Sequence, residues 1–257
     1  MKKPIDMDKL VSIVTPTYNS ANFIFETVSS IKKQTYPNWE LIMVDDGSSD
    51  DTVSLLKKFA SEDKRITWER LSQNSGPAIA RNTGIEKAKG HYLTFIDADD
   101  IWFPEFIETS IKAINTSGCP FVFASYKRLD EDLNPLYPDF IVPEKVTYTD
   151  ILKSNSISCL TAFIDIQKLG KKFMPQIRKR QDMGLWLKYL KETDFALGIK
   201  KPLAIYRIRK NSLSRNKWAL LKYQWDFYRK VEKLTFTRSV YYMTNWFYRG
   251  LKKYKRT

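Results

Sequence analysis

Short apolar runs alternate with helical patterns through about the first 130 residues of the chain. The apolar runs cover residues 10–15, 39–44, 66–71, 91–96 and 121–126, and each has the length of a buried strand. Between them, apolar side chains recur at helical spacing in residues 21–35, 51–61 and 77–89, and Pro104 begins a further helix. This alternation predicts an α/β fold, in which a mostly parallel sheet is flanked by helices.

The order is less regular beyond residue 130. A Pro-containing stretch over residues 130–144 interrupts the repeat, a helical pattern follows at residues 180–192, and residues 203–208 have the composition of a strand. Hydrophobic residues make up 43% of the 257, which is enough for one α/β domain with an appendage. We expect a catalytic or binding domain over residues 1–214 and a helical tail over residues 215–257.

The net charge of +14 is concentrated in this tail, which carries twelve Lys and Arg against two acidic residues. The tail also holds twelve aromatic residues and no Pro, a composition typical of helix.

Two Cys and one His exclude a Cys/His zinc site and a disulfide framework. Because His91 opens a predicted strand, general-base chemistry falls to carboxylates. With no signal peptide and no apolar run of about 18 residues, we expect a cytoplasmic protein that does not span a membrane.

Polar clusters follow three of the predicted strands directly, at residues 15–19, 45–50 and 97–100. Ligands of open parallel sheets bind beyond the carboxyl ends of the strands, so the three clusters should face one cleft. Asp97 and Asp99 alternate around Ala98, which sends two carboxylates to one side and suits Mg²⁺ or Mn²⁺. The same triplet also suits a turn in which Asp99 or Asp100 caps the next helix.

Three further residues each have two interpretations. Asp46 lies in a Gly-centred segment that is either a plain turn or a site where a carboxylate accepts hydrogen bonds from a base or ribose. Arg81 is either an exposed structural residue or a phosphate contact near a helix start. Asp182 either caps a helix or takes a proton from an acceptor hydroxyl, and one role does not exclude the other.

Four motifs together resemble the family 2 glycosyltransferases with a GT-A fold. They are Pro16-Thr17-Tyr18-Asn19, the segment 44–50 (VDDGSSD), the segment 74–82 (NSGPAIARN) and the segment 95–100 (FIDADD), in this order within 90 residues. The resemblance covers about residues 10–214, with a donor half over about 10–100 and an acceptor half over 101–214. Within the family the chain is most similar to bacterial enzymes of the teichuronic acid, capsule and lipopolysaccharide type.

The resemblance implies a role for each matching residue. The motif Pro16, Thr17, Tyr18 and Asn19 would line the nucleotide pocket, and Asp46 would hold the base, usually uracil. Arg81 would sit near the diphosphate. Asp97, followed by Ala98, would face the ribose or sugar, and Asp99 would ligate Mn²⁺ or Mg²⁺ through the DXD motif. Asp182 would be the general base of an inverting displacement in which a UDP-sugar is the donor and a saccharide or lipid-linked saccharide the acceptor.

Two departures from the family pattern qualify these roles. Gln181-Asp182 stands where many relatives have Glu-Asp, and Tyr206-Arg207-Ile208-Arg209 replaces Tyr-Arg-x-His, so Arg209 is expected to contact phosphate. The Gln-x-x-Arg-Trp signature of processive relatives is absent, which favours a single addition. The departures keep open an alternative, a catalytically inactive GT-A-like protein that associates with membrane or nucleic acid. A nucleic-acid module alone would leave the clustered carboxylates unexplained, so no nucleic-acid partner is expected.

The tail has the pattern of a basic amphipathic helix. One side of its last part holds Val240, Met243, Phe247, Leu251 and Tyr254, and the other holds Arg249, Lys252, Lys253 and Arg256. An earlier stripe consists of Trp218, Leu221, Trp225 and Tyr228. We expect this tail to lie on the inner face of the cell membrane. The alternative is that its aromatic side packs on the catalytic domain or on a second subunit.

Overall fold

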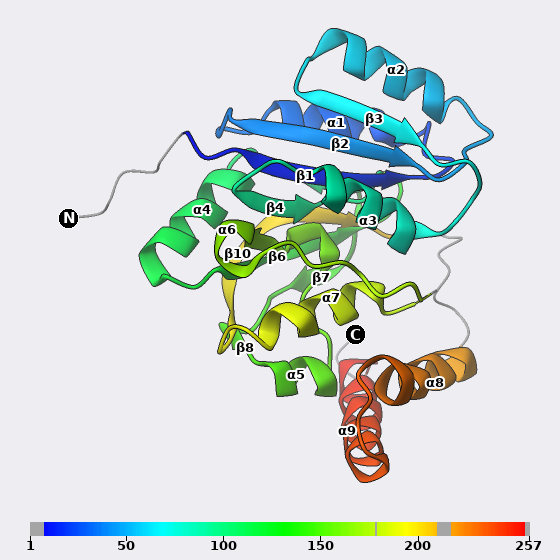
Figure 1. Ribbon diagram of the computed structural model, residues 1–257, viewed down its shortest axis with the longest axis vertical. Helices are drawn as coiled ribbons and strands as arrows, with labels where there is room; N and C mark the ends of the chain where they lie inside the picture. The colour runs from blue at the N-terminus through cyan, green and yellow to red at the C-terminus, as the bar shows by residue number, and fades with distance from the viewer. Residues whose placement is uncertain (1–7, 178, 210–216, 255–257) are drawn as a thin grey trace.

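A ten-stranded sheet forms the centre of the protein, as a computed structural model of residues 8–177, 179–209 and 217–254 shows (Figure 1). Its first half is all parallel, in the order β3 (Ile66–Arg70), β2 (Trp39–Asp45), β1 (Val11–Thr17) and β4 (Tyr92–Phe95). The sheet continues through β9 (Phe163–Asp165), β6 (Phe121–Leu129), β10 (Ala196–Arg207) and β5 (Ile101–Trp102). Two further strands lie off this path, β7 (Pro135–Phe140) beside β6 and β8 (Lys145–Val146) beside β10.

The register of the parallel strands brings their carboxyl ends to one edge. Val11 pairs with Trp39 and Thr17 with Asp45, so β1 and β2 end side by side. On the other side of β1, Val14 pairs with Phe95, the last residue of β4. The motifs that follow these three strands are therefore neighbours in space, as the sequence predicts.

Helices cover both faces of the sheet. One face packs against α1 (Ile24–Lys32), α2 (Thr52–Glu62) and α4 (Phe106–Ser117), and the other against α3 (Pro77–Lys87), α5 (Tyr148–Lys153), α6 (Ile166–Leu169) and α7 (Gln181–Leu190). Side chains of a strand alternate between the faces, so Ile13 belongs to the first core and Val14 to the second. Strands buried on both faces need continuous apolar runs, which is why these segments are recognisable in the sequence.

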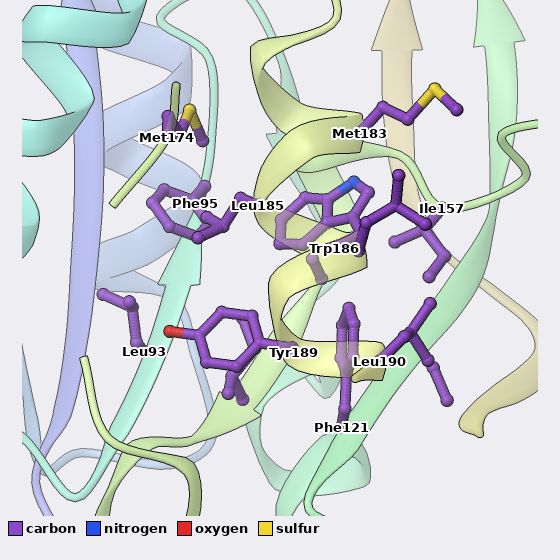
Figure 2. Packing of buried hydrophobic residues seen from close by; sticks show 14 of the residues in the cluster. Leu93, Phe95, Phe121, Ile157, Met174, Met183, Leu185, Trp186, Tyr189 and Leu190 are labelled. Atoms are coloured by element: carbon purple, nitrogen blue, oxygen red, sulfur yellow. The ribbon is translucent and has the colours of Figure 1, made fainter. Parts of the chain in front are cut away.

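The second core is built around α7. Trp186 is fully buried, and its ring centroid lies 6.0 Å from that of Phe95 on β4 and 5.5 Å from that of Phe121 on β6 (Figure 2). Gly84 lets α3 approach β1 closely, because a Cβ atom at this position would lie 2.4 Å from Val14 Cγ1. This packing fixes the starts of α3 and α7, which carry Arg81 and Asp182.

The tail is helical, as predicted, and consists of α8 (Lys217–Asp226), a π-helical turn (Phe227–Val231) and α9 (Phe236–Tyr254). Its inner side joins the second core through Phe227, Tyr228 and Leu234, and the Tyr228 hydroxyl donates a hydrogen bond of 2.5 Å to the Leu152 carbonyl of α5. Tyr228 and Met243, which the helical pattern assigns to the amphipathic stripes, therefore pack toward the domain. Within the described residues, no helix is both long enough and apolar enough to cross a membrane.

The predicted α/β class with its mostly parallel sheet is confirmed, but the second half of the chain differs in detail. Strand β10 begins at Ala196, seven residues before the predicted strand, and its register with β6 shifts around Pro202. The irregular stretch 130–144 contains β7, and β5, β8 and β9 are two or three residues long. Strands this short do not produce a periodic pattern. The predicted boundary between residues 214 and 215 lies outside the described residues.

Candidate active site

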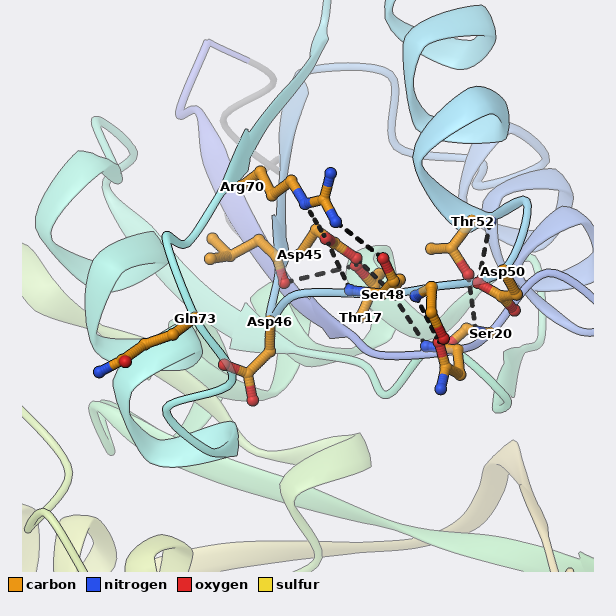
Figure 3. A network of polar contacts seen from close by, with 12 residues as sticks. Thr17, Ser20, Asp45, Asp46, Ser48, Asp50, Thr52, Arg70 and Gln73 are labelled. Carbon is orange, nitrogen blue, oxygen red and sulfur yellow. Dashed lines mark hydrogen bonds and ion pairs between the residues drawn. The ribbon is translucent and has the colours of Figure 1, made fainter.

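The turn after β2 is organised by the buried carboxylate of Asp45. Its Oδ2 accepts a hydrogen bond of 3.1 Å from the Ser48 amide and lies 3.4 Å from Arg70 Nε, and its Oδ1 accepts from the Ser48 hydroxyl (Figure 3). The Thr17 hydroxyl lies 3.4 Å from the same carboxylate. These contacts occupy Asp45 and Thr17 within the protein, so both shape the loop.

Asp46 points away from that network (Figure 3) and accepts hydrogen bonds from the Ser75 and Gly76 amides, at 2.6 and 2.8 Å. It thereby joins the β2 turn to the loop that starts α3. Gly47 has φ +80°, and a Cβ atom there would lie 3.2 Å from the Asn74 nitrogen. The turn therefore requires glycine both for its backbone conformation and for its contact with the neighbouring loop.

The motif after β1 is tied to the same turn. Asn19 has φ +47°. Its backbone nitrogen donates to Ser48 Oγ, and its side-chain Oδ1 accepts from the Ser49 backbone amide, both at 2.9 Å. Pro16 is half-buried, whereas the Tyr18 side chain is 50% exposed at the surface of the loop. Of this motif, Tyr18 is the residue with a free aromatic face for a planar ligand.

Arg81 and Asp97 form a partly buried ion pair of 2.5 Å between α3 and the loop after β4. The Arg81 side chain is only 8% exposed and its Nε has no partner, so the interpretation as an exposed structural arginine is wrong. Burial alone would lower the pKa of Arg81, but Asp97 outweighs burial and raises it, and the guanidinium stays charged. Because Arg81 lines the adjoining cleft, its positive charge is suited to bind an anion there, although its unpartnered Nε atom is itself buried.

The segment 97–100 is held by Arg207 at the end of β10. Its amide donates to Asp100 Oδ1 at 2.9 Å, and its Nε donates to the Asp99 carbonyl at 2.9 Å. The remaining nitrogens donate to the Glu131 carbonyl at 2.8 Å and to the Glu26 carboxylate. The capping alternative is not realised, because α4 has Glu105 at its N-cap and no side-chain cap.

Asp99 carries negative charge that its surroundings compensate only in part. Burial, and then the nearby Asp97, raise the pKa of Asp99, although Arg209 acts in the opposite direction with its Nη1 3.5 Å from Asp99 Oδ2. The Asp97 and Asp99 side chains remain 35% and 26% exposed. Two crowded, reachable carboxylates fit a hard divalent cation that shares its other ligands with water and phosphate. In the described part of the chain, no three acidic, Cys or His side chains form a site made of protein ligands alone.

Asp182 lies in the first turn of α7, where a helix N-terminus favours negative charge. It does not cap the helix, because the N-cap residue is Arg180 and no side-chain cap is formed. Instead, the Asn155 amide nitrogen donates to Asp182 Oδ2 at 3.2 Å, while Asn155 Oδ1 accepts from the Ile157 amide at 3.1 Å. Asn155 thus anchors the carboxylate to the loop before Cys159.

A cleft of about 330 Å³ unites part of the predicted site. Arg81, Asp97, Gln181 and Asp182 all line it, although 101 positions separate the first from the last. The other predicted residues lie on neighbouring segments and do not line this cleft: Pro16, Thr17, Tyr18, Asn19, Asp46, Ala98, Asp99 and Arg209. The structure therefore brings the proposed phosphate contact and the proposed base to one cavity.

Sequence reasoning missed five residues of this region. Asn155 and Arg207 position Asp182 and the segment 97–100, and three aromatic residues, Tyr126, Phe140 and Tyr206, line the cleft. Arg207 stands in a motif that the sequence singled out, but its side-chain and amide contacts come from three separate segments, at Asp99 and Asp100, at Glu131 and at Glu26. Burial raises the pKa of Tyr126 to about 12 and, with nearby carboxylates, raises that of Tyr206 further, so both phenols stay neutral.

Comparison with known proteins agrees with this geometry. The family model of glycosyl transferase family 2 matches residues 12–164. TuaG of Bacillus subtilis, named for teichuronic acid biosynthesis, is 40% identical over 95% of this chain and 97% of its own. WfgD of Escherichia coli, named a UDP-Glc:alpha-D-GlcNAc-diphosphoundecaprenol beta-1,3-glucosyltransferase, is 36% identical over 96% of each chain.

Among solved structures, residues 1–349 of TarS from S. aureus with UDP-GlcNAc superpose with a TM-score of 0.70 at 19% identity, over 92% of this chain and 71% of that one. This likeness establishes the GT-A fold. The relatives are named as transferases, and nothing in these comparisons supports an inactive binding protein. The chain is a glycosyltransferase and belongs to glycosyl transferase family 2.

Proposed function

We propose that this protein transfers one hexose from a UDP-sugar to a hydroxyl of a lipid-linked diphosphosaccharide, with inversion at the anomeric carbon. The observation that carries the proposal is the common cleft of Arg81, Asp97 and Asp182. The activity for which WfgD is named supports the classes of donor and acceptor, since WfgD shares 36% identity with this chain over nearly its whole length. The contribution to a cell-surface polysaccharide follows the naming of TuaG.

In this proposal the donor lies along the sheet edge. Asp46 receives the base, with Tyr18 at its open side, and Arg81 and Arg209 face the diphosphate. Asp97 and Asp99 would hold Mn²⁺ or Mg²⁺, which when bound would neutralise charge on the diphosphate. Arg81 is already fixed by Asp97, so its charge needs no reorganisation as negative charge grows on the leaving group.

Asp182 acts as the general base. It removes the proton of the acceptor hydroxyl while that oxygen forms a bond to the anomeric carbon, and the bond from this carbon to the β-phosphate oxygen breaks. The electron pair leaves with UDP, and the proton remains on Asp182. Asn155 keeps the carboxylate turned toward the cleft during this step.

The reaction is tested with UDP-glucose, UDP-galactose, UDP-GlcNAc and UDP-GalNAc, each with Mn²⁺ and an α-GlcNAc-diphosphate carrying an undecyl chain. We expect UDP release that depends on the acceptor for one of these donors, and a product with the β configuration by NMR. A product with retained configuration, or no UDP release that depends on the acceptor from any donor, would contradict the proposal.

We further propose that the enzyme lies on the cytoplasmic face of the membrane through α9. Five large apolar or aromatic side chains of this helix are 40–63% exposed: Phe236, Val240, Tyr241, Phe247 and Tyr248. Exposed basic residues accompany them, namely Lys222, Arg229, Lys233, Arg238 and Arg249. The opposite side of the helix, with Ser239 and Tyr242, packs on the domain. A helix that is fixed on one side and amphipathic on the other suits attachment within the headgroup region.

A further inference from the structure

Three aromatic rings form one wall of the cleft. Tyr126 of β6 is the register partner of Phe140 at the end of β7, and their ring centroids lie 5.0 Å apart with the planes inclined by 22°. Tyr206 of β10 pairs with Arg128, two residues beyond Tyr126 on β6, so its side chain points to the same face of the sheet. Its ring centroid lies 5.9 Å from that of Tyr126. We call Tyr126, Phe140 and Tyr206 the aromatic wall.

The wall is open to a ligand. Tyr206 is 39% exposed, Tyr126 and Phe140 are half-buried, and all three line the same cavity as Asp182. The other lining residues of the cavity include hydrogen-bonding side chains on the loop before Cys159, namely Asn155, Ser156 and Ser158. Flat apolar rings beside a polar rim match a pyranose, which has C–H groups on its faces and hydroxyls around its edge.

The charge of the cleft narrows the choice of sugar. Asp97 and Asp182 line it, and among its described lining residues the one cation, Arg81, is already paired with Asp97. Arg81 is the cation expected to meet the donor diphosphate, so an anionic sugar placed beside Asp182 would be repelled without compensation. A neutral hexose or N-acetylhexosamine therefore fits the cleft better than a uronic acid.

We infer that the aromatic wall is the platform for the acceptor sugar, and that it selects a neutral pyranose whose hydroxyl faces Asp182. This inference rests on the proposed function and specifies where its acceptor binds. The base and diphosphate of the donor have their own predicted contacts at Asp46 and Arg81, on the other half of the sheet. The wall thus serves recognition of the acceptor, and Asp182 stands between it and the donor.

The test measures equilibrium binding without turnover. Calorimetry on the full-length protein, loaded with UDP and Mn²⁺, compares undecyl diphosphate carrying α-GlcNAc with the same lipid carrying glucuronic acid. Phe140→Leu keeps an apolar side chain but removes the flat ring. Tyr206→Ser removes a second ring at a position that is 39% exposed, where we expect the fold to tolerate the change. Tyr137→Ala is the matched control. Tyr137 is an exposed aromatic residue of β7, the strand that carries Phe140, but it does not line the cleft.

We expect Phe140→Leu and Tyr206→Ser each to weaken binding of the GlcNAc lipid by about two- to tenfold, with unchanged affinity for UDP. Tyr137→Ala should bind as the unaltered protein does, and the glucuronic acid lipid should bind more weakly. Equal binding by the unaltered protein and both wall variants would overturn the inference, as would no binding of the GlcNAc lipid at all or a preference for the glucuronic acid lipid. Failure of the unaltered protein to bind UDP would instead contradict the proposed function.

Discussion

Adjacent residues of this site do different work. Asp45 is fully buried and accepts hydrogen bonds from Ser48 within its own turn. Asp46 instead accepts a hydrogen bond from the Gly76 amide, in the loop before α3. The difference follows from the strand: successive side chains at the end of β2 point to opposite sides. An acidic pair that reads as one motif in the sequence therefore divides into a residue that shapes the turn and a residue that contacts the loop before α3.

At the residue scale, Asp182→Asn tests the general base. The amide preserves shape and volume but does not accept the proton, so kcat should fall by about 10²- to 10⁴-fold. Affinity for UDP and the melting temperature should stay the same. Asp194→Asn, at an exposed position outside the cleft, is the control. Turnover by Asp182→Asn within twofold of the unaltered enzyme would remove Asp182 from the mechanism.

Arg207→Lys tests whether a guanidinium fork holds the segment 97–100. The Arg207 guanidinium donates to the Asp99 carbonyl, the Glu131 carbonyl and the Glu26 carboxylate at the same time. Lysine keeps the positive charge, but its ammonium group does not reach all three acceptors together. We expect the free energy of unfolding to drop by about 2 to 4 kcal/mol, measured by urea denaturation. Arg209→Lys, at a half-exposed position, should change stability little, and equal stability of both variants would argue against this role.

At the scale of elements, the turns after β1 and β2 stabilise each other. Besides the contacts of Asn19, the Ser20 amide donates to Thr52 Oγ1 at 2.7 Å, and Asp50 accepts from the Ala21 and Thr52 amides at 3.1 Å each. The start of α2 is thereby fixed to the loop that carries Tyr18. The proposed nucleotide contacts Tyr18 and Asp46 therefore lie on loops whose shape depends on this network.

This network makes stability depend on pH through Asp50. Burial alone would raise the pKa of Asp50, but hydrogen bonds from Thr52 and Ala21 outweigh it and lower the pKa. Because the pKa is lower in the folded than in the unfolded protein, Asp50 stabilises the fold above its unfolded value of about 3.9, and this contribution is lost as pH falls through the folded value.

Asp50→Asn should accordingly be less stable than the unaltered protein at pH 7, and the two should converge below about pH 4. Urea denaturation at a series of pH values measures the difference, with Asp51→Asn at the exposed neighbouring position as the control. A stability difference that does not change between pH 7 and pH 3.5 would contradict the assignment.

The sequence predicts a strand well where both faces of that strand are buried. The runs that became β1, β2, β4 and β6 are mainly apolar, so their existence and order follow from composition, whereas β3 (ITWER) is an edge strand with a single fully buried residue. Strand β7 has mainly exposed residues, and β10 runs through Lys200, Lys201 and Pro202. Tertiary pairing with β6, which local patterns do not encode, produces these two strands.

At the scale of the whole molecule, the tail belongs to the domain and also presents a separate surface. The inner residues of the tail complete the core around Trp186, while Phe236 and Phe247 of α9 are 63% and 52% exposed. The tail therefore packs on the domain, as one interpretation of the sequence expects, and a membrane contact through its exposed outer face stays a prediction. The relatives TuaG and WfgD match this chain over its tail as well, at 95–96% coverage.

Flotation with vesicles of anionic lipid tests the membrane contact. We expect the full-length protein to float and the double variant Phe236→Ser/Phe247→Ser to bind at least about tenfold more weakly, because two aromatic rings lose their burial in lipid. Phe25→Ser is the matched control, since Phe25 is 62% exposed on α1, away from the tail. Equal flotation of the double variant, or no flotation of the unaltered protein, would contradict the contact.

The site was predictable where its residues follow strands of the parallel half. Thr17 is the last residue of β1, Asp46 and Asp97 closely follow β2 and β4, and topology alone brings these three residues to one edge. The acceptor half was not predictable in this way. Asn155, Phe140 and Tyr206 reach the cleft from an irregular loop, an edge strand and a bulged strand, and their meeting depends on packing between distant segments.

A crystal structure of the protein with UDP and Mn²⁺ tests the central claim most directly, because that claim concerns where a single ligand meets three separate loops. We predict uracil at Asp46, the diphosphate beside Arg81, and Mn²⁺ on the Asp97–Asp99 segment, with the side of the cleft at Asp182 left open for the acceptor. UDP bound elsewhere would contradict the account. So would UDP bound at this edge of the sheet with neither Asp46 nor Asp99 in contact with the nucleotide or its metal ion.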